Sequence, residues 1–187
     1  DAGWAGSSFD DSAWSVGAAP IGYGSTGLGT VLTPVADTSL RPRAVYFRTD
    51  FSLQDASRVS ALELTGVADD GVVIYVNGVE VVRQNMPTGT ITNQTFALSA
   101  VRTSTANASP VVVQVPLALL VDGRNVIAAE THVNYRGTPD ISFKLKADVT
   151  ASTAPVNKAP TAKIDATGTG LSVAVDGSGS SDPDGTI

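Results

Sequence analysis

The segment VVIYVNGVEVV, residues 72–82, is the stretch of sequence that decides the local fold. Two runs rich in β-branched residues meet there at Asn77 and Gly78. An Asn-Gly pair supplies the positive φ angles that a two-residue type I′ turn requires. The segment therefore predicts a β-hairpin.

Three further segments alternate apolar and polar residues with the period of a half-buried strand. Their apolar positions are Val45, Phe47, Thr49, Phe51 and Leu53, then Leu62 and Leu64, and then Ile141, Phe143, Leu145, Ala147 and Val149. Another strand is predicted at residues 125–133, and a single helical turn is predicted at residues 116–120. No helix of ordinary length is indicated, so two packed sheets are expected to bury these faces. The predicted class is all-β, a β-sandwich.

The composition excludes several kinds of partner. Twelve Lys and Arg against eighteen Asp and Glu give a net charge of −6, and the basic residues form no cluster. Nucleic acid and anionic membrane surfaces are therefore not expected as partners. No apolar run approaches the roughly 18 residues of a membrane span. The residues from Asp1 onward do not have the pattern of a signal peptide, so we expect any targeting segment to lie upstream.

Cysteine is absent and His132 is the sole histidine. Disulfides, thiolate metal sites and cysteine nucleophiles are thereby excluded.

The chain divides by composition into three parts. Residues 1–150 carry the strand patterns of one domain, and residues 151–160 form a polar stretch interrupted by proline, as interdomain linkers do. Residues 161–187 suggest one further pair of strands. Two strands alone are marginal in water, so we expect this piece to belong to a longer parent protein.

The run from Thr161 to Ile187 resembles the opening of a polycystic-kidney-disease-type (PKD) domain, an immunoglobulin-like β-sandwich. The resemblance rests on the loop SGSSDPDG, residues 178–185. The rest of such a domain does not follow, so the segment is expected to be its truncated start. In bacterial secreted enzymes these domains act as spacers or accessory binders. Asp182 and Asp184 could bind Ca²⁺ there, or could simply stabilise the Asp-Pro-Asp-Gly turn.

Residues 1–150 resemble the jelly-roll, galactose-binding-like modules of bacterial secreted hydrolases and metallophosphoesterases. The motifs that carry the resemblance are FDDSAW (9–14), APIGYG (19–24), VYFRTDF (45–51), DDGVVIYVNG (69–78) and NVIAAETH (125–132). The resemblance implies a secreted, extracellular accessory module that accompanies a catalytic domain of the same parent chain. Such modules normally carry an additional first strand before the segment that contains Trp4.

Asp69 and Asp70 are candidate calcium ligands. In protective-antigen-type lectin domains a similar Asp-Asp-Gly segment binds Ca²⁺ through paired aspartates, and the metal then coordinates sugar hydroxyls. Side chains of adjacent strand residues point to opposite faces, so both can reach one ion only if the backbone is irregular. The alternative needs no ligand: one aspartate accepts backbone N–H bonds at the turn and the other is solvated.

Asn134, Tyr135, Arg136 and Asp140 are the candidate carbohydrate-binding residues. Sugar rings present apolar C–H patches rimmed by hydroxyls, so their sites pair an aromatic face with carboxylates, amides or guanidinium groups. Tyr135 is the aromatic residue that we expect to be exposed. The alternative is that a single loop tyrosine packs as a lid.

Several other residues receive structural interpretations. Glu130 and His132 share one face of their strand and could approach one another, but no further group completes a catalytic site. Asp10 and Asp11 are expected to stabilise a local turn, and Trp14 to fill the core.

The sequence thus favours a non-catalytic accessory module that binds a polysaccharide or other glycan, with calcium as a candidate cofactor. The alternative is a structural spacer that packs against neighbouring domains and has no ligand of its own.

Overall fold

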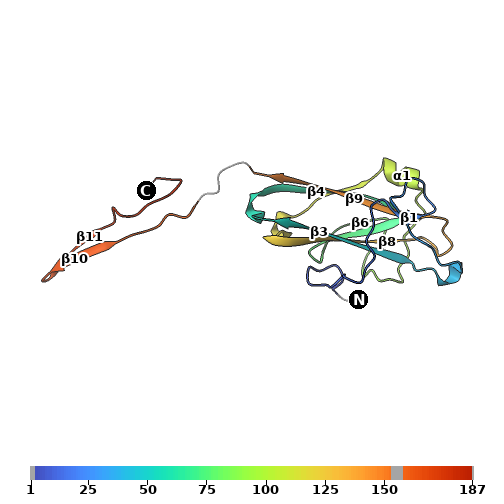
Figure 1. Ribbon diagram of the computed structural model, residues 1–187, viewed down its shortest axis with the longest axis horizontal. Helices are drawn as coiled ribbons and strands as arrows, with labels where there is room; N and C mark the ends of the chain where they lie inside the picture. Colours follow the sequence, from blue (N-terminus) through green and yellow to red (C-terminus); the bar gives the residue numbers. More distant parts are fainter. Residues whose placement is uncertain (1–2, 153–157, 187) are drawn as a thin grey trace. The chain divides into compact units, whose positions relative to one another are not determined.

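The computed structural model describes residues 3–152 and 158–186 (Figure 1). The chain forms two compact units, Asp1–Ala151 and Ser152–Ile187. Residues 153–157, which belong to the predicted linker, lie outside the described residues. No helix in the described part of the chain is both long and apolar enough to cross a membrane.

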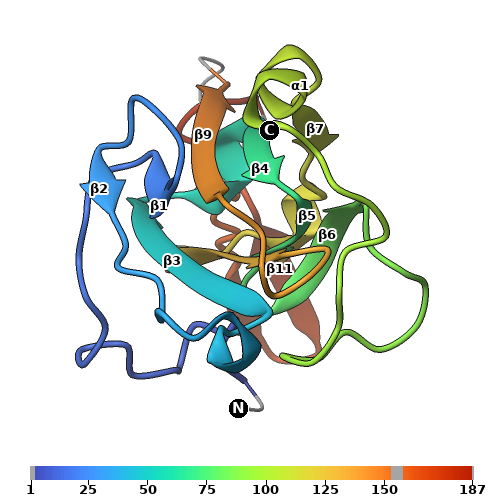
Figure 2. The ribbon, with the colours of Figure 1, turned by 90° about the vertical axis from the view of Figure 1, so that its right-hand side faces the viewer.

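The first unit is a sandwich of two β-sheets (Figure 2), which confirms the predicted all-β class. The first sheet has the strand order β2 (Thr30–Val31), β1 (Ile21–Tyr23), β9 (Ile141–Ala151), β4 (Val59–Asp69) and β7 (Val111–Gln114). The second has the order β3 (Ala44–Leu53), β8 (Gly123–His132), β5 (Gly71–Val76) and β6 (Val79–Gln84). Neighbours in these two sheets are antiparallel except β1 and β2.

The predicted hairpin joins β5 to β6. Asn77 has φ of 49° and Gly78 of 87°, as a type I′ turn requires. The Asn77 side chain also anchors the turn to the next strand. Its Oδ1 accepts the Val126 N–H at 2.8 Å, and its Nδ2 donates to the Leu119 carbonyl at 2.8 Å. The turn residue thus serves both local geometry and tertiary packing.

The core lies between the two sheets. Leu62 and Leu64 of β4 are fully buried, and they pack with inward residues of the second sheet such as Ile74 and Val76. The predicted alternation holds on β4, since Glu63 and Thr65 between these positions remain partly exposed.

The burial predicted for two other strands is wrong in part. On β9, Ile141 and Phe143 are buried, but Ala147 is exposed and Val149 is 46% exposed. On β3, Thr49 is exposed and the other inward residues are only half-buried. Both strands flank the same side of the sandwich, where the two layers do not close over one another.

Trp14 lies outside the core, contrary to the prediction. The segment before β1 covers the outer face of the second sheet, where Trp4 packs against Tyr46 and Tyr75 with ring centroids 4.7 and 5.5 Å away. Trp14 stacks on Trp4 at 6.5 Å and stays half-buried. The outer face of this sheet is therefore a second apolar layer.

The aspartates of the FDDSAW motif hold this covering segment in place. Asp10 accepts the Ser12 N–H at 3.0 Å, the predicted turn role. Asp11 instead pairs with Nε of Arg48 on β3 at 2.7 Å. The Arg48 side chain is only 2% exposed and also donates to the carbonyls of Trp4 and Gly6.

Short helical turns connect the strands. They are η1 (Thr38–Leu40), η2 (Ala56–Arg58), α1 (Thr103–Ala108) and η3 (Leu117–Leu119). The last confirms the single turn predicted at residues 116–120. The six-residue α1 was not predicted.

The second unit contains one antiparallel hairpin of β10 (Asp165–Thr169) and β11 (Ser172–Asp176), as the apolar pattern predicted. Thr161 and Ser181 form an isolated bridge beside it. In the SGSSDPDG loop, Asp182 Oδ1 accepts the Gly185 N–H at 3.1 Å, and Asp184 accepts the Lys158 N–H at 2.8 Å. The first bond stabilises the turn, and the second ties the loop to residue 158, which is 26 residues earlier in the chain.

Candidate functional site

Three loops of the first unit meet beside the junction of β4 and β5. The first is the junction itself, with Asp69 and Asp70, whose peptide bond is cis. The second follows β8 and contains residues 133–140, and the third leads into α1 at Thr103. Two of the predicted carbohydrate-binding residues meet the predicted metal ligands here: Asn134 bonds Asp70 through its backbone N–H, and Asp140 shares Thr103 with Asp69.

Asp70 fastens these loops to one another. Its Oδ1 accepts the backbone N–H of Val101 at 2.7 Å, and its Oδ2 accepts the backbone N–H of Asn134 at 2.8 Å. The following Gly71 leaves no room for a side chain, because a Cβ there would lie 2.5 Å from the sulfur of Met86. Asp70 therefore has the backbone-bonding role that the sequence left open as an alternative.

The same alternative expected the other aspartate to be solvated, and this expectation is wrong, because Asp69 is only 1% exposed. Its Oδ2 accepts a hydrogen bond from Thr103 Oγ1 at 2.8 Å, while its Oδ1 is buried with no partner in the described protein. Burial, opposed by the Thr103 bond and reinforced by the charges of Asp140 and Asp70, raises the pKa of Asp69 to about 7. The carboxylate is poorly compensated by the protein alone.

Asp140 reaches the same cluster from the start of β9. Its Oδ2 lies 3.4 Å from Thr103 Oγ1, whose proton is donated to Asp69, and Thr103 Oγ1 also lies 3.0 Å from Ser25 Oγ. Asp69, Asp140, Thr103 and Ser25 thus gather carboxylate and hydroxyl oxygens in one place, as hard cations require.

Asn134 and Tyr135 lie on the loop after β8 that Asp70 holds through the Asn134 N–H. The side-chain Oδ1 of Asn134 is buried without a partner, like Oδ1 of Asp69. Tyr135 is 48% exposed, as predicted, and its ring rests against Gly137, where a Cβ would lie 3.1 Å from Cε2. An exposed aromatic face therefore adjoins an oxygen-rich loop.

Arg136 does not face outward as a free donor. Its Nη1 donates to the carbonyls of Ser39 and Arg41 at 2.7 and 2.9 Å. The guanidinium thus fixes the loop after β8 against η1. Its role in these contacts is structural, and Tyr135, Asn134 and Asp140 remain the stronger candidates for ligand contact.

The cluster contains carboxylate and hydroxyl oxygens, which are ligand types that hard divalent cations accept. No group of three or more His, Asp or Glu side chains in the described residues is arranged to hold a metal. Calcium, however, also takes amide, hydroxyl and backbone carbonyl oxygens. Two side-chain oxygens near the Asp70 to Asn134 bond are buried without a partner in the described residues: Oδ1 of Asp69, the residue before Asp70, and Oδ1 of Asn134 itself.

Glu130 and His132 do approach one another, but inside the protein. His132 Nε2 lies 3.0 Å from Glu130 Oε2 and its Nδ1 lies 2.9 Å from the carbonyl of Thr95. Tyr75 donates to Glu130 Oε1 at 2.6 Å. Burial tends to raise the pKa of Glu130, but the bonds from His132, Tyr75 and Tyr46 outweigh it and hold that pKa below its usual value. His132 is 0% exposed, so this pair does not reach a substrate.

Sequence reasoning missed Thr103 and Ser25 as members of the cluster. Both are small hydroxyl residues in polar stretches, and neither carries a local signal of its role. Only the tertiary fold places them beside Asp69, which is 34 residues before Thr103 in the chain.

No protein-family model matches the chain, and no curated protein matches it. Among solved structures, it is similar to an alpha-L-rhamnosidase of Streptomyces avermitilis complexed with L-rhamnose, with 18% identity and a TM-score of 0.43 over 59% of this chain and 9% of that one. It is also similar to an alpha-L-rhamnosidase from Dictyoglumus thermophilum, with 14% identity and a TM-score of 0.35 over 58% of this chain and 12% of that one. The chain thus spans about a tenth of the length of these structures, and likenesses this low leave the function to be argued from the site.

Proposed function

We propose that the first unit is a non-catalytic module that binds a glycan through a calcium-assisted site at the junction of β4 and β5, within a secreted multidomain hydrolase. The observation that carries this proposal is the joining of Asp70 to Asn134. Asn134 directly precedes the exposed Tyr135, and the Oδ1 atoms of Asn134 and Asp69 are both buried without a partner in the described residues.

Each residue has a distinct part in this site. Asp69, Asn134 and Asp140 would hold the cation, with Asp70 keeping the two loops in place. Calcium, when bound, would offer open coordination positions to sugar hydroxyls. Tyr135 would pack against the apolar face of a sugar ring.

Electrostatics supports the need for a cation. Burial disfavours the charge on Asp69, and the charges of Asp140 and Asp70 raise the pKa of Asp69 further. A bound divalent cation would favour the ionised form of Asp69 and would give its Oδ1 a partner.

The proposal is tested by polysaccharide pull-down with the full chain, in calcium and in chelator. We expect retention on at least one polysaccharide in calcium, its loss in chelator, and a loss of tenfold or more in affinity for Tyr135→Ala. Leu40→Ala, which removes another exposed apolar side chain, is the matched control and should bind normally. Folded protein that binds no member of a broad panel under either condition would refute the glycan proposal.

The second candidate is a structural spacer. It is favoured by the hydrogen bonds of Arg136 and Asp70, since both side chains bond the backbone of neighbouring loops. This function predicts that deleting the module lowers the stability of the parent protein and leaves its substrate binding unchanged.

A further inference from the structure

The strand β9 has one side that is paired only at its beginning. On one edge it pairs with β4 from Ser142 to Ala151. On the other edge it pairs with β1 only at Ile141, Ser142 and Phe143. The pairing of β1 with β9 stops at Ile21, because the residue before it, Pro20, has no N–H to donate to a ladder. In the described part of the chain, no strand pairs with residues 144–151 on that edge.

The inward face of the same stretch is apolar, and it becomes exposed beyond Leu145, which is half-buried against the core. Leu145, Ala147 and Val149 follow the buried Phe143 with the period of a strand, yet Val149 is 46% exposed. Across the gap, β3 is also an edge strand, since it pairs only with β8. Its inward Thr49 is exposed. A free backbone edge therefore coincides with apolar side chains that lack a cover.

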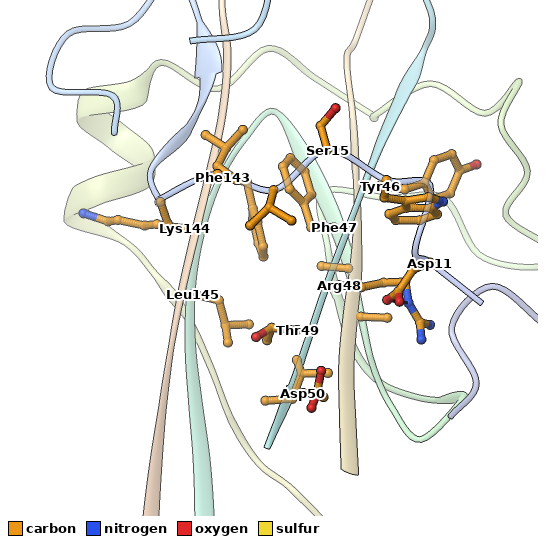
Figure 3. A pocket seen from close by; sticks show the side chains of 18 residues that line it. Asp11, Ser15, Tyr46, Phe47, Arg48, Thr49, Asp50, Phe143, Lys144 and Leu145 are labelled. Atoms are coloured by element: carbon orange, nitrogen blue, oxygen red, sulfur yellow. Dashed lines mark hydrogen bonds and ion pairs between the residues drawn. The ribbon is translucent and has the colours of Figure 1, made fainter. Parts of the chain in front are cut away.

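A cavity of about 500 Å³ lies between these two strands. Its apolar walls come from Phe47, Ile127, Ala129, Phe143 and Leu145. Figure 3 shows Leu145 extending from β9 toward Thr49 of β3, while Lys144 points away from the cavity. The segment before β1 also lines the cavity, through Trp14, Val16 and Ala19.

Charges on the outer face of β9 limit which segment fits. Lys144 and Lys146 are exposed there, with the Lys146 side chain 73% exposed. Lys146 pairs with Asp148 at 2.8 Å, and Lys144 Nζ bonds Asn107 Oδ1. Residues that lie opposite one another on adjacent strands interact, so acidic residues beside these lysines are favoured.

From this we infer that the edge of β9 at residues 144–151 accepts an extended segment of a partner polypeptide as an added β-strand. The segment alternates apolar residues, which enter the cavity over Leu145 and Phe47, with acidic residues, which face outward beside Lys144 and Lys146. Main-chain hydrogen bonds supply the affinity, and the cavity and the lysines supply selectivity. This assignment stands independently of glycan binding.

The test uses the full chain and a labelled synthetic nonapeptide in which valine alternates with glutamate. A scrambled peptide of the same composition, without the alternation, is the control. We expect saturable binding of the alternating peptide by fluorescence anisotropy, and slower amide hydrogen exchange within residues 144–151. We expect at least tenfold weaker binding of the scrambled peptide.

Two variants locate the interaction. Leu145→Trp fills the cavity and should weaken binding at least tenfold, whereas Val112→Trp, at another exposed strand position, should not. Lys146→Glu should weaken binding of the glutamate peptide and strengthen binding of a peptide with the same pattern in which lysine replaces glutamate. Circular dichroism checks that each variant is folded.

Three results would overturn the inference. They are equal binding of the two peptides, unchanged exchange along β9, and concentration-dependent protection of residues 144–151 without any peptide. The last would assign the edge to a second copy of the chain instead.

Discussion

The carboxylate of Asp70 accepts the backbone N–H of Asn134 at 2.8 Å, across 64 residues of sequence. The same carboxylate accepts the N–H of Val101. One side chain thus fixes the relative positions of three loops, and the candidate site exists only because it does so.

Replacing Asp70 should therefore destabilise the fold. Asp70→Ala leaves two N–H groups without their acceptor, and each unsatisfied buried group costs about 1–3 kcal/mol. We expect a matching drop in the free energy of unfolding, measured by urea titration. Asp148→Ala, which removes an exposed aspartate, should change it by less than about 1 kcal/mol. Equal effects of the two substitutions would contradict the loop-fastening role.

Asp69→Asn should have the opposite effect on the calcium-free protein. The amide keeps the shape of the side chain and can still accept from Thr103, but it removes a buried charge near Asp140 and Asp70. We expect the free energy of unfolding at pH 7 to rise by about 1 kcal/mol or more. A loss of stability in chelator would show that the charge is already well compensated.

Glu130 gives the fold an acid-sensitive contribution. Its pKa is lower in the folded protein than in the unfolded chain, so its stabilisation is full above about pH 4.3 and is lost as pH falls through the folded pKa. The difference in unfolding free energy between wild type and Glu130→Gln should therefore be largest at pH 6–7 and shrink toward pH 3. Urea titrations at several pH values measure it, and a difference independent of pH would be the contrary result.

Arg48→Lys should release the segment that covers the second sheet. A lysine ammonium cannot keep the bonds to Asp11, Trp4 and Gly6 together, because it lacks the planar fork of guanidinium. We expect faster proteolytic cleavage within residues 5–13 and a shifted tryptophan emission. Arg83→Lys, whose guanidinium pairs with Glu80 elsewhere on the surface, is the control and should leave both unchanged.

Local patterns predicted the strands well, because period-two alternation and the Asn77-Gly78 turn depend on neighbours in sequence. They failed where burial depends on distant partners. Ala147 and Val149 have the pattern of a core face, but nothing in the described part of the chain pairs with that edge of β9 beyond Phe143, and both are exposed. Trp14 fails for the same reason, since the outer face of the second sheet is covered by the chain itself.

The candidate site was predictable only in pieces. Asp69 and Asp70 stood out as an adjacent acidic pair before a glycine, and Tyr135 as a loop aromatic. That these pieces form one cluster follows from the tertiary contact between Asp70 and Asn134 and from the approach of Thr103. No spacing along the sequence contains that information.

The most direct test of the central claim is calcium titration of the full chain by isothermal calorimetry, with wild type and Asp69→Asn in parallel. Saturable calcium binding by wild type, lost in Asp69→Asn and retained in Asp148→Asn, is the result that our account predicts. Wild-type protein that is folded and takes up no calcium, or an Asp69→Asn protein that binds it equally well, would contradict the account.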